Sequence, residues 1–169
     1  MDIYFVRRKG FNIFSLAIRY GEAFHRGRHS GDWNIRDYSH VAVSIDNGHI
    51  YEAADNKVQR IPERDFNDLY TVAEVHSFKI DGKKRALLRL WLEGQIGKNY
   101  AWCQILKIAG KLLYDKKPKD YVEDNYICTE LGLRSLVITG HLKNKKGLDY
   151  YSVSECRDLV HVLATSAKI

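Results

Sequence analysis

The chain has few cysteines: its 169 residues include three, and no two of them form a CxxC pair. A disulfide framework or a zinc knuckle needs closely spaced cysteines. His25 and His29 have helical spacing, but no cysteine or pair of acidic residues accompanies them at the spacing of metal ligands. We therefore expect reduced thiols, no metal site and no other cofactor.

The chain also lacks a long hydrophobic run. The apolar stretch at residues 1–6 is too short for a signal peptide, and the basic residues 7–9 follow it instead of preceding it. Residues 11–20 are interrupted by polar side chains and fall far below the ~20 apolar residues that a membrane span needs. We expect a cytoplasmic protein without stable membrane insertion, although a helix lying on a membrane surface stays open for this segment.

The excess of positive charge is small. Lys and Arg number 27 against 21 for Asp and Glu, which gives a net charge of +6. The basic residues form separate short clusters without an RNA-binding signature, so we do not expect a nucleic-acid partner. The length and the 45% hydrophobic content predict one globular domain over residues 1–169.

The stretch from residue 38 to residue 53 is typical of a β-hairpin. Runs rich in β-branched residues flank Asp46-Asn47-Gly48, which is a strong turn signal. A three-residue loop with Gly48 in the left-handed conformation would pair Ala42 with Glu52. His40 and Glu52 would then be diagonal neighbours on one face, about 7–8 Å apart at the backbone.

The loop length decides which side chains share a face. A two-residue turn would place His40 and Glu52 on opposite faces. With the three-residue loop, the face opposite His40 is apolar, and we expect it to pack in the hydrophobic core. The His40 face carries mostly small residues. We expect another element to dock on that His40 face.

A second informative stretch runs from residue 125 to residue 137. Its leucines and Val137 form a partial helical stripe, which places Cys128 in the first turn of a helix. A helix N-terminus carries about half a positive charge and unpaired N–H groups, which stabilise a thiolate and bind an oxyanion. We expect this helix to be the element that docks on the His40 face.

Cys128, His40 and Glu52 would then supply the three parts of a thiol catalytic site. A histidine acts as general base for the thiol, and a carboxylate orients the imidazole. The alternative roles are structural, because a lone cysteine is usually buried and inert and a hairpin glutamate is usually solvated. Cys156 also falls in the first turn of a predicted helix, but nothing in the sequence places a histidine opposite it.

The order of these motifs resembles the circularly permuted NlpC-type papain-like enzymes, in particular the YiiX/YebB-like branch, which is related to lecithin:retinol acyltransferase. Residues 39–43 (SHVAV) resemble the family block SHVGI, with Ala42 in place of glycine. Residues 128–132 (CTELG) resemble CSELV, and residues 97–102 (GKNYAW) resemble GxxYD, with Ala101 in place of the acidic residue. In the permuted group the histidine comes first, then the third polar residue, then the cysteine, as in this chain.

The resemblance implies an α+β papain-like domain in which a small antiparallel sheet packs against helices. It implies a cysteine peptidase or amidase with Cys128 as nucleophile, His40 as base and Glu52 as the third residue. Tyr126, Tyr100 and Trp33 are candidates for binding the substrate or the oxyanion, with core packing as the alternative role.

The resemblance permits more than one substrate class. We expect hydrolysis of an amide bond in a peptide, an isopeptide or a peptidoglycan fragment. A lipid-directed acyltransferase or thioesterase and a non-catalytic papain-like binding module stay open as alternatives. A small protein of this kind suits a phage or another mobile element.

Hydrophobic periodicity and turn residues predict the other elements. Residues 152–155 (SVSE) form a capping box that starts a final helix. The polar, glycine-bearing residues 25–37 predict a loop. Strands are predicted at 3–6, 58–61 and 72–80, and helices at 11–24, 83–95 and 100–113.

Overall fold

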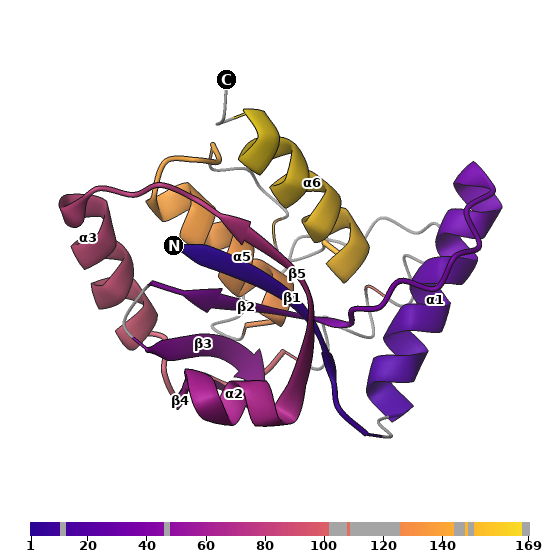
Figure 1. Ribbon diagram of the computed structural model, residues 1–169, viewed down its shortest axis with the longest axis horizontal. Helices are drawn as coiled ribbons and strands as arrows, with labels where there is room; N and C mark the ends of the chain where they lie inside the picture. The colour runs from indigo at the N-terminus through magenta and orange to yellow at the C-terminus, as the bar shows by residue number, and fades with distance from the viewer. Residues whose placement is uncertain are drawn as a thin grey trace.

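The computed structural model describes residues 1–10, 13–45, 48–101, 108, 126–143, 148 and 151–166. These residues form five strands and five helices, labelled as in Figure 1. The strands are β1 (Asp2–Arg8), β2 (His40–Ser44), β3 (His49–Ala54), β4 (Lys57–Pro62) and β5 (Tyr70–Ser77). The helices are α1 (Ile13–Ser30), α2 (Glu63–Leu69), α3 (Gly82–Glu93), α5 (Cys128–Ile138) and α6 (Val153–Ser166).

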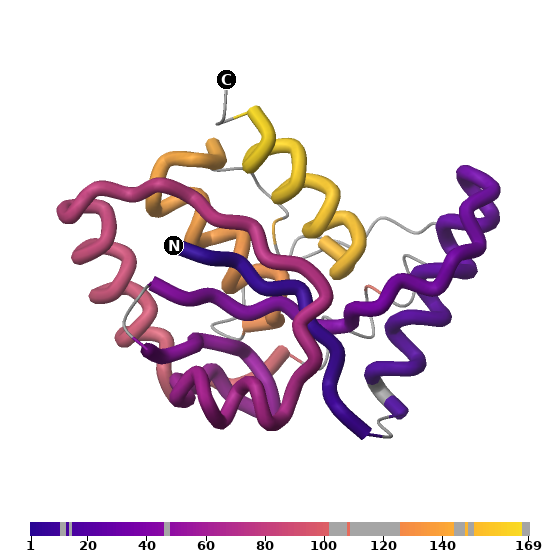
Figure 2. The backbone as a smooth tube through the Cα atoms, in the orientation of Figure 1, coloured from indigo at the N-terminus to yellow at the C-terminus, as the bar shows by residue number. Residues whose placement is uncertain are grey.

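The five strands form one antiparallel sheet in the order β4-β3-β2-β1-β5. Although β1 comes first in the chain, it lies between β2 and β5, as the tube in Figure 2 shows. The expectation of an α+β protein whose small antiparallel sheet packs against helices is therefore confirmed.

The β2–β3 hairpin has the predicted register. Ala42 pairs with Glu52, and Gly48 has a φ of +70°, as a three-residue loop requires. The other two residues of this loop, Asp46 and Asn47, lie outside the described residues. His40 and Glu52 thus share one face of the sheet.

A second, tighter hairpin joins β3 to β4. Its turn consists of Asp55 and Asn56, which both have positive φ, +47° and +81°, as in a type I′ turn. Asn and Asp tolerate this backbone conformation better than other side chains. The turn pairs Glu52 with Gln59, so that a third polar side chain faces the same side of the sheet.

Helices cover both faces of the sheet. The larger core joins Val41, Val43 and Tyr51 to the leucines of α5, and a smaller cluster around Ala42 packs against Phe66 of α2. In Figure 1, α5 accordingly runs behind the strands and α2 lies in front of them.

The prediction that the Cys128 helix docks on the His40 face is therefore wrong. The helix packs on the opposite, apolar face because its leucines need the larger hydrophobic surface. The small residues of the His40 face accommodate Phe66 and Tyr70 instead.

The other elements follow the predictions in part. α1 continues past the predicted end and includes residues 25–30, so the prediction of a loop there is wrong. Gly27 leaves room for the indole of Trp33 to lie against this part of the helix. The capping box of α6 is confirmed by reciprocal hydrogen bonds, Ser152 N to Glu155 Oε2 at 2.9 Å and Glu155 N to Ser152 Oγ at 3.3 Å. α2 was not predicted, and most of the predicted 100–113 helix lies outside the described residues.

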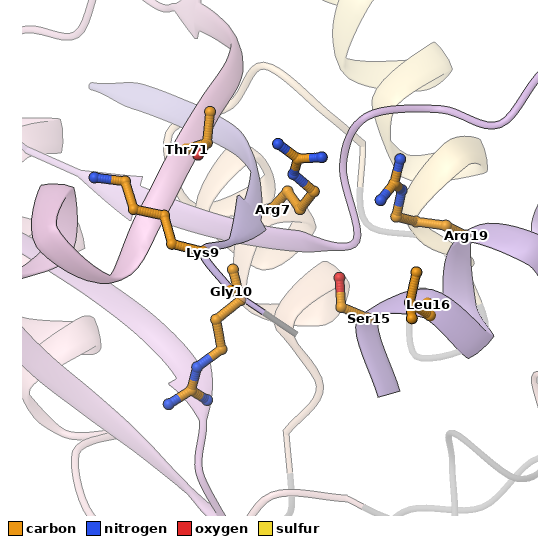
Figure 3. Close-up of a pocket in the computed structure, with 8 residues that line it drawn as sticks. Arg7, Lys9, Gly10, Ser15, Leu16, Arg19 and Thr71 are labelled. Atoms are coloured by element: carbon orange, nitrogen blue, oxygen red, sulfur yellow. The ribbon is translucent and has the colours of Figure 1, made fainter. Parts of the chain in front are cut away.

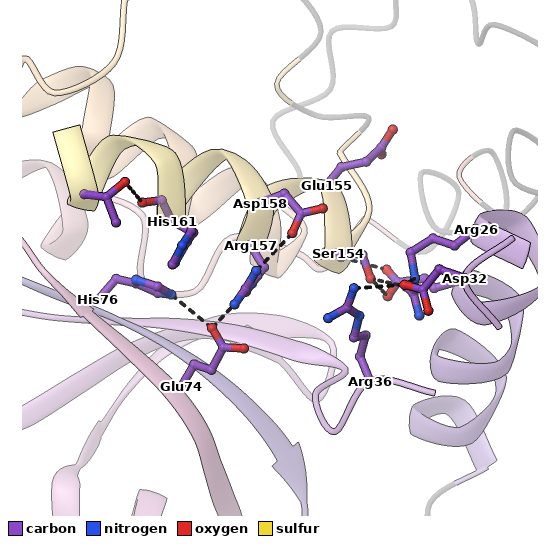
Figure 4. A network of polar contacts seen from close by, with 12 residues as sticks. Arg26, Asp32, Arg36, Glu74, His76, Ser154, Glu155, Arg157, Asp158 and His161 are labelled. Atoms are coloured by element: carbon purple, nitrogen blue, oxygen red, sulfur yellow. Dashed lines mark hydrogen bonds and ion pairs between the residues drawn. The ribbon is translucent and has the colours of Figure 1, made fainter. Parts of the chain in front are cut away.

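Polar contacts fix α6 against the sheet and against α1. Arg157 donates through Nε to Glu74 of β5 at 2.8 Å, as Figure 4 shows. At the start of α6, the Ser154 hydroxyl donates to buried Glu22 of α1 at 2.6 Å and accepts a hydrogen bond from Arg26 at 2.7 Å. α1 is thereby held in place beside the sheet. In the part of the chain that the structure describes, no helix is both long and apolar enough to cross a membrane.

The packing of α5 on β2 leads to a testable prediction. A Cβ added at Gly132 would lie 3.0 Å from Cγ1 of Val41. Gly132→Val should therefore lower the free energy of unfolding by about 1–3 kcal/mol, as overpacking of a core does. Urea denaturation followed by circular dichroism would measure this change.

Gly21→Val is the matched control, because Gly21 is also helical but its added Cβ would meet no atom within 4 Å. The control should change stability by no more than about 0.5 kcal/mol. Equal losses in the two variants would contradict the described packing of α5 on β2.

Candidate active site

His40 is the first residue of β2, at the end of the sheet where α5 begins. It pairs with Val6 of β1 and is only 9% exposed. The ring of Tyr70 stacks on the imidazole, with a centroid distance of 5.4 Å and an interplanar angle of 17°. These contacts restrict the imidazole to one orientation.

Glu52 is fully buried and receives hydrogen bonds from three side chains. Nε2 of His40 lies 2.8 Å from Glu52 Oε2, and Nε2 of Gln59 donates to Oε1 at 2.8 Å. The Tyr70 hydroxyl also hydrogen-bonds to this carboxylate. Burial alone would raise the pKa of Glu52, but these donors, His40 foremost, bring the pKa below its usual value. Glu52 is therefore a carboxylate at neutral pH.

Cys128 is the first residue of α5, as predicted, and follows Ile127 at the N-cap. Its side chain hydrogen-bonds to His40 and is 5% exposed. Because Nε2 of His40 is engaged by Glu52, Nδ1 is the ring nitrogen that remains for the sulfur. The backbone N–H of Cys128 has no acceptor within the helix, as at every first helical position.

The imidazole of His40 is held between these two partners in its charged form. Burial favours the neutral ring, but the charge and hydrogen-bond interactions with Cys128, and then those with Glu52, raise the pKa of His40 to about 10. An imidazolium donates hydrogen bonds from both ring nitrogens, which matches the two partners.

Tyr100 also lies beside Cys128. Residues 97–100 follow the edge of β4, and Tyr100 forms a parallel bridge with Tyr126, two residues before Cys128. The phenol of Tyr100 hydrogen-bonds to Cys128. Burial, together with the interaction with Cys128, raises the pKa of Tyr100 well above its ordinary value, so this phenol remains a hydrogen-bond donor.

The other two predicted binding residues lie differently. The ring of Tyr126 packs edge-on against Trp91, and the charged groups of Lys98 and Arg134 lie over its face. Trp33 is 59% exposed and packs edge-on against Phe24 of α1. The described ring contacts of Trp33 are thus with α1, so the prediction that it borders the site stays a prediction.

Sequence reasoning missed two residues of the site, Tyr70 and Gln59. Gln59 had a signal in the sequence, because a two-residue turn at Asp55-Asn56 fixes the register that sets Gln59 opposite Glu52. Tyr70 had none. It reaches His40 from β5, and only the sheet order brings this strand near the hairpin.

Cys156 provides a contrast within the same chain. It lies in the first turn of α6 but is fully buried in the core. Burial raises the pKa of its thiol well above the usual value. The third cysteine, Cys103, lies outside the described residues.

The geometry places a thiol, an imidazole and a carboxylate next to one another in that order. This is the arrangement that thiol-dependent acyl transfer requires. Among the residues that the structure describes, no group of His, Cys, Asp or Glu is arranged to hold a metal ion.

Comparisons with known proteins do not assign the chain to a family. No protein-family model matches the chain, and no curated protein or solved structure shows significant similarity to it. The function of the protein is therefore inferred from the site itself.

The charge of His40 can be measured by NMR titration of its ring. We expect a midpoint near pH 10, far above the ~6.5 of a free histidine. His76 is an internal control, because burial lowers its pKa and it should titrate below 6.5 in the same sample. A His40 midpoint between about 6 and 7 would contradict the charged state of His40.

The titration also has a consequence for stability. Because folding raises the pKa of His40, the linked stabilisation is fully present below pH 6.5 and is lost as the pH rises towards 10. His40→Ala should lack this part of the pH dependence.

Proposed function

We propose that this protein is a cysteine hydrolase that cleaves an amide bond, with Cys128 as nucleophile, His40 as general base and acid, and Glu52 as the residue that orients His40. The observation that carries the proposal is the position of the His40 ring, which is hydrogen-bonded to buried Glu52 on one side and to Cys128 at the start of α5 on the other. The order of the three residues in the chain and the motifs around them support a papain-like domain of the permuted NlpC type.

The proposed reaction begins with the thiolate of Cys128, whose proton resides on His40. The sulfur attacks the amide carbonyl carbon and forms a tetrahedral intermediate. The negative charge on its oxygen is stabilised by the backbone N–H of Cys128 at the helix N-terminus. The phenol of Tyr100, which already hydrogen-bonds to the sulfur, is a second donor for this oxygen.

The intermediate then collapses by breaking the carbon–nitrogen bond. His40 gives its proton to the departing amine, which leaves a thioester on Cys128. A water molecule gives a proton to neutral His40 and attacks the thioester. The carboxylic acid product leaves, and the thiolate–imidazolium pair is restored.

Glu52 and its other two donors have a positioning role in this scheme. The carboxylate fixes the ring orientation of His40 and stabilises its charge in both steps. Gln59 and Tyr70 hold the carboxylate in turn, so that one oxygen of Glu52 faces His40 and the other faces Gln59.

The acyl-enzyme can be tested without knowledge of the natural substrate. With p-nitrophenyl acetate we expect a burst of nitrophenol, and peptide mapping by mass spectrometry should find the acetyl group on Cys128. Cys128→Ala should abolish the burst and leave the circular dichroism spectrum unchanged. Cys156→Ala is the matched control and should retain the burst. A burst that survives in Cys128→Ala would overturn the proposal, and the absence of any burst in the native protein would favour a binding module.

The roles of the other two residues can be separated in the same assay. His40→Ala should slow acylation by about 10²- to 10⁴-fold, as the loss of a general base does. Glu52→Gln should cost less, because glutamine keeps a hydrogen-bond acceptor for the ring. Equal losses would mean that Glu52 does more than orient His40. Transfer of the acetyl group to an added alcohol in preference to water would indicate an acyltransferase instead of a hydrolase.

A further inference from the structure

A cavity of about 410 Å³ lies at the end of β1, where the chain passes into α1. This volume lies in the range of small-molecule sites. Figure 3 shows its lining, which is dominated by cations. The cationic side chains are Arg7, Arg8, Lys9 and Arg19, and the hydroxyls of Ser15 and Thr71 lie beside them.

Two of the arginines converge on a single oxygen atom. Nη1 of Arg7 lies 3.0 Å and Nη2 of Arg19 lies 3.2 Å from Oδ1 of Asp37. In Figure 3, both guanidinium groups extend towards the same side of the cavity. Guanidinium groups in such an arrangement suit the oxygens of a carboxylate or a phosphate. The side chain of Asp37 is 57% exposed, so solvent and ligands can compete with it.

The cavity has an excess of positive charge. Arg8 is paired with Asp55 at 2.7 Å, and Lys9 donates to the carbonyl oxygen of Asn67 at 2.7 Å. Among the described residues, the ion pairs of these four cations involve only the carboxylates of Asp37 and Asp55, so cations outnumber their ion-pair partners. Such an excess attracts a small anion.

The cavity lining is connected to His40 through the pairing of β1 with β2 and through one hydrogen bond. Val6 is the pairing partner of His40, and Arg7 is the next residue of β1. The hydroxyls of Ser15, which lines the cavity, and of Ser39, which precedes His40, are 2.6 Å apart. The cavity lining thus includes the neighbour of the residue that pairs with His40 and a serine that contacts the residue before His40.

Arg8 lines the cavity and also interacts with residues around His40. It pairs with Tyr70 across β1 and β5, and Tyr70 stacks on His40. Arg8 also interacts electrostatically with Glu52. Arg8 thus links the cavity lining to Tyr70 and Glu52 of the candidate site.

We propose that this basic cavity binds an anionic group, a phosphate or a carboxylate, carried by the substrate. The substrate is then an amide that also carries a negative charge. That the anion belongs to the substrate rests on the proposed function, whereas the anion site itself rests on the cavity and its charges.

Titration of the native protein with inorganic phosphate and, separately, with glutarate tests the site. At low ionic strength we expect saturable binding by isothermal titration calorimetry, with NMR shifts at the Nε–Hε groups of Arg7 and Arg19. Tighter binding of phosphate would assign a phosphate-bearing substrate, and tighter binding of glutarate a carboxylate-bearing one. The absence of saturable binding of either anion would overturn the proposal.

Three variants locate the binding. Arg7→Gln should weaken binding by about tenfold or more, because a hydrogen bond to a charged group is lost. Asp37→Asn should tighten it, because the competing carboxylate is removed. Arg64→Gln makes the same change in net charge at an exposed position on α2 and should leave binding unchanged. Equal effects of Arg7→Gln and Arg64→Gln would mean that only the net charge matters, which would contradict a site.

The two proposals fail separately. Acetylation of Cys128 by the neutral ester p-nitrophenyl acetate does not need the anion site. A protein that is acetylated but binds neither anion overturns the cavity proposal alone. A protein that binds phosphate through Arg7 but is never acetylated keeps the anion site and loses the hydrolase.

Discussion

The site depends on a buried pair of opposite charges, the His40 imidazolium and the Glu52 carboxylate. Glu52 is fully buried, and an isolated carboxylate in such a place costs several kcal/mol. The three donors around it offset that cost, and His40 is the only charged one among them. A slip of one residue in the β2–β3 register would move the Glu52 side chain to the other face of the sheet, into the apolar core. The interaction between His40 and Glu52 therefore depends on the register of this hairpin.

Around this pair, the end of the sheet collects segments that are far apart in the chain. The apolar face of β2 binds the leucines of α5, and this contact brings the first residue of α5 to the His40 ring. Residues 97–100 pair with the edge of β4 and then with Tyr126, which fixes the entry into α5. The end of β1 and the start of α1 supply the basic cavity at the same end of the sheet. Cys128, His40 and the basic cavity are thus held by backbone pairing and core packing.

The local parts of this site could be predicted from the sequence. Turn residues and alternation gave the hairpin register that places His40 and Glu52 on one face, and the leucine stripe gave the start of α5 at Cys128. The side on which α5 docks could not be predicted from the small residues of the His40 face. The leucines of the helix pack on the opposite face because it offers the larger apolar surface. The stacking of Tyr70 on His40 depends on β1 lying between β2 and β5, which no local pattern encodes.

The reactivity of each cysteine, followed across pH, tests the thiolate–imidazolium pair. Iodoacetamide alkylates thiolates, and mass spectrometry maps the modified residue. Cys128 should react rapidly below pH 7 and much more slowly in His40→Ala, whereas fully buried Cys156 should react slowly in both proteins. If Cys128 reacts no faster than Cys156, or is unaffected by the loss of His40, the thiolate–imidazolium pair does not exist, which would contradict the proposed catalytic site.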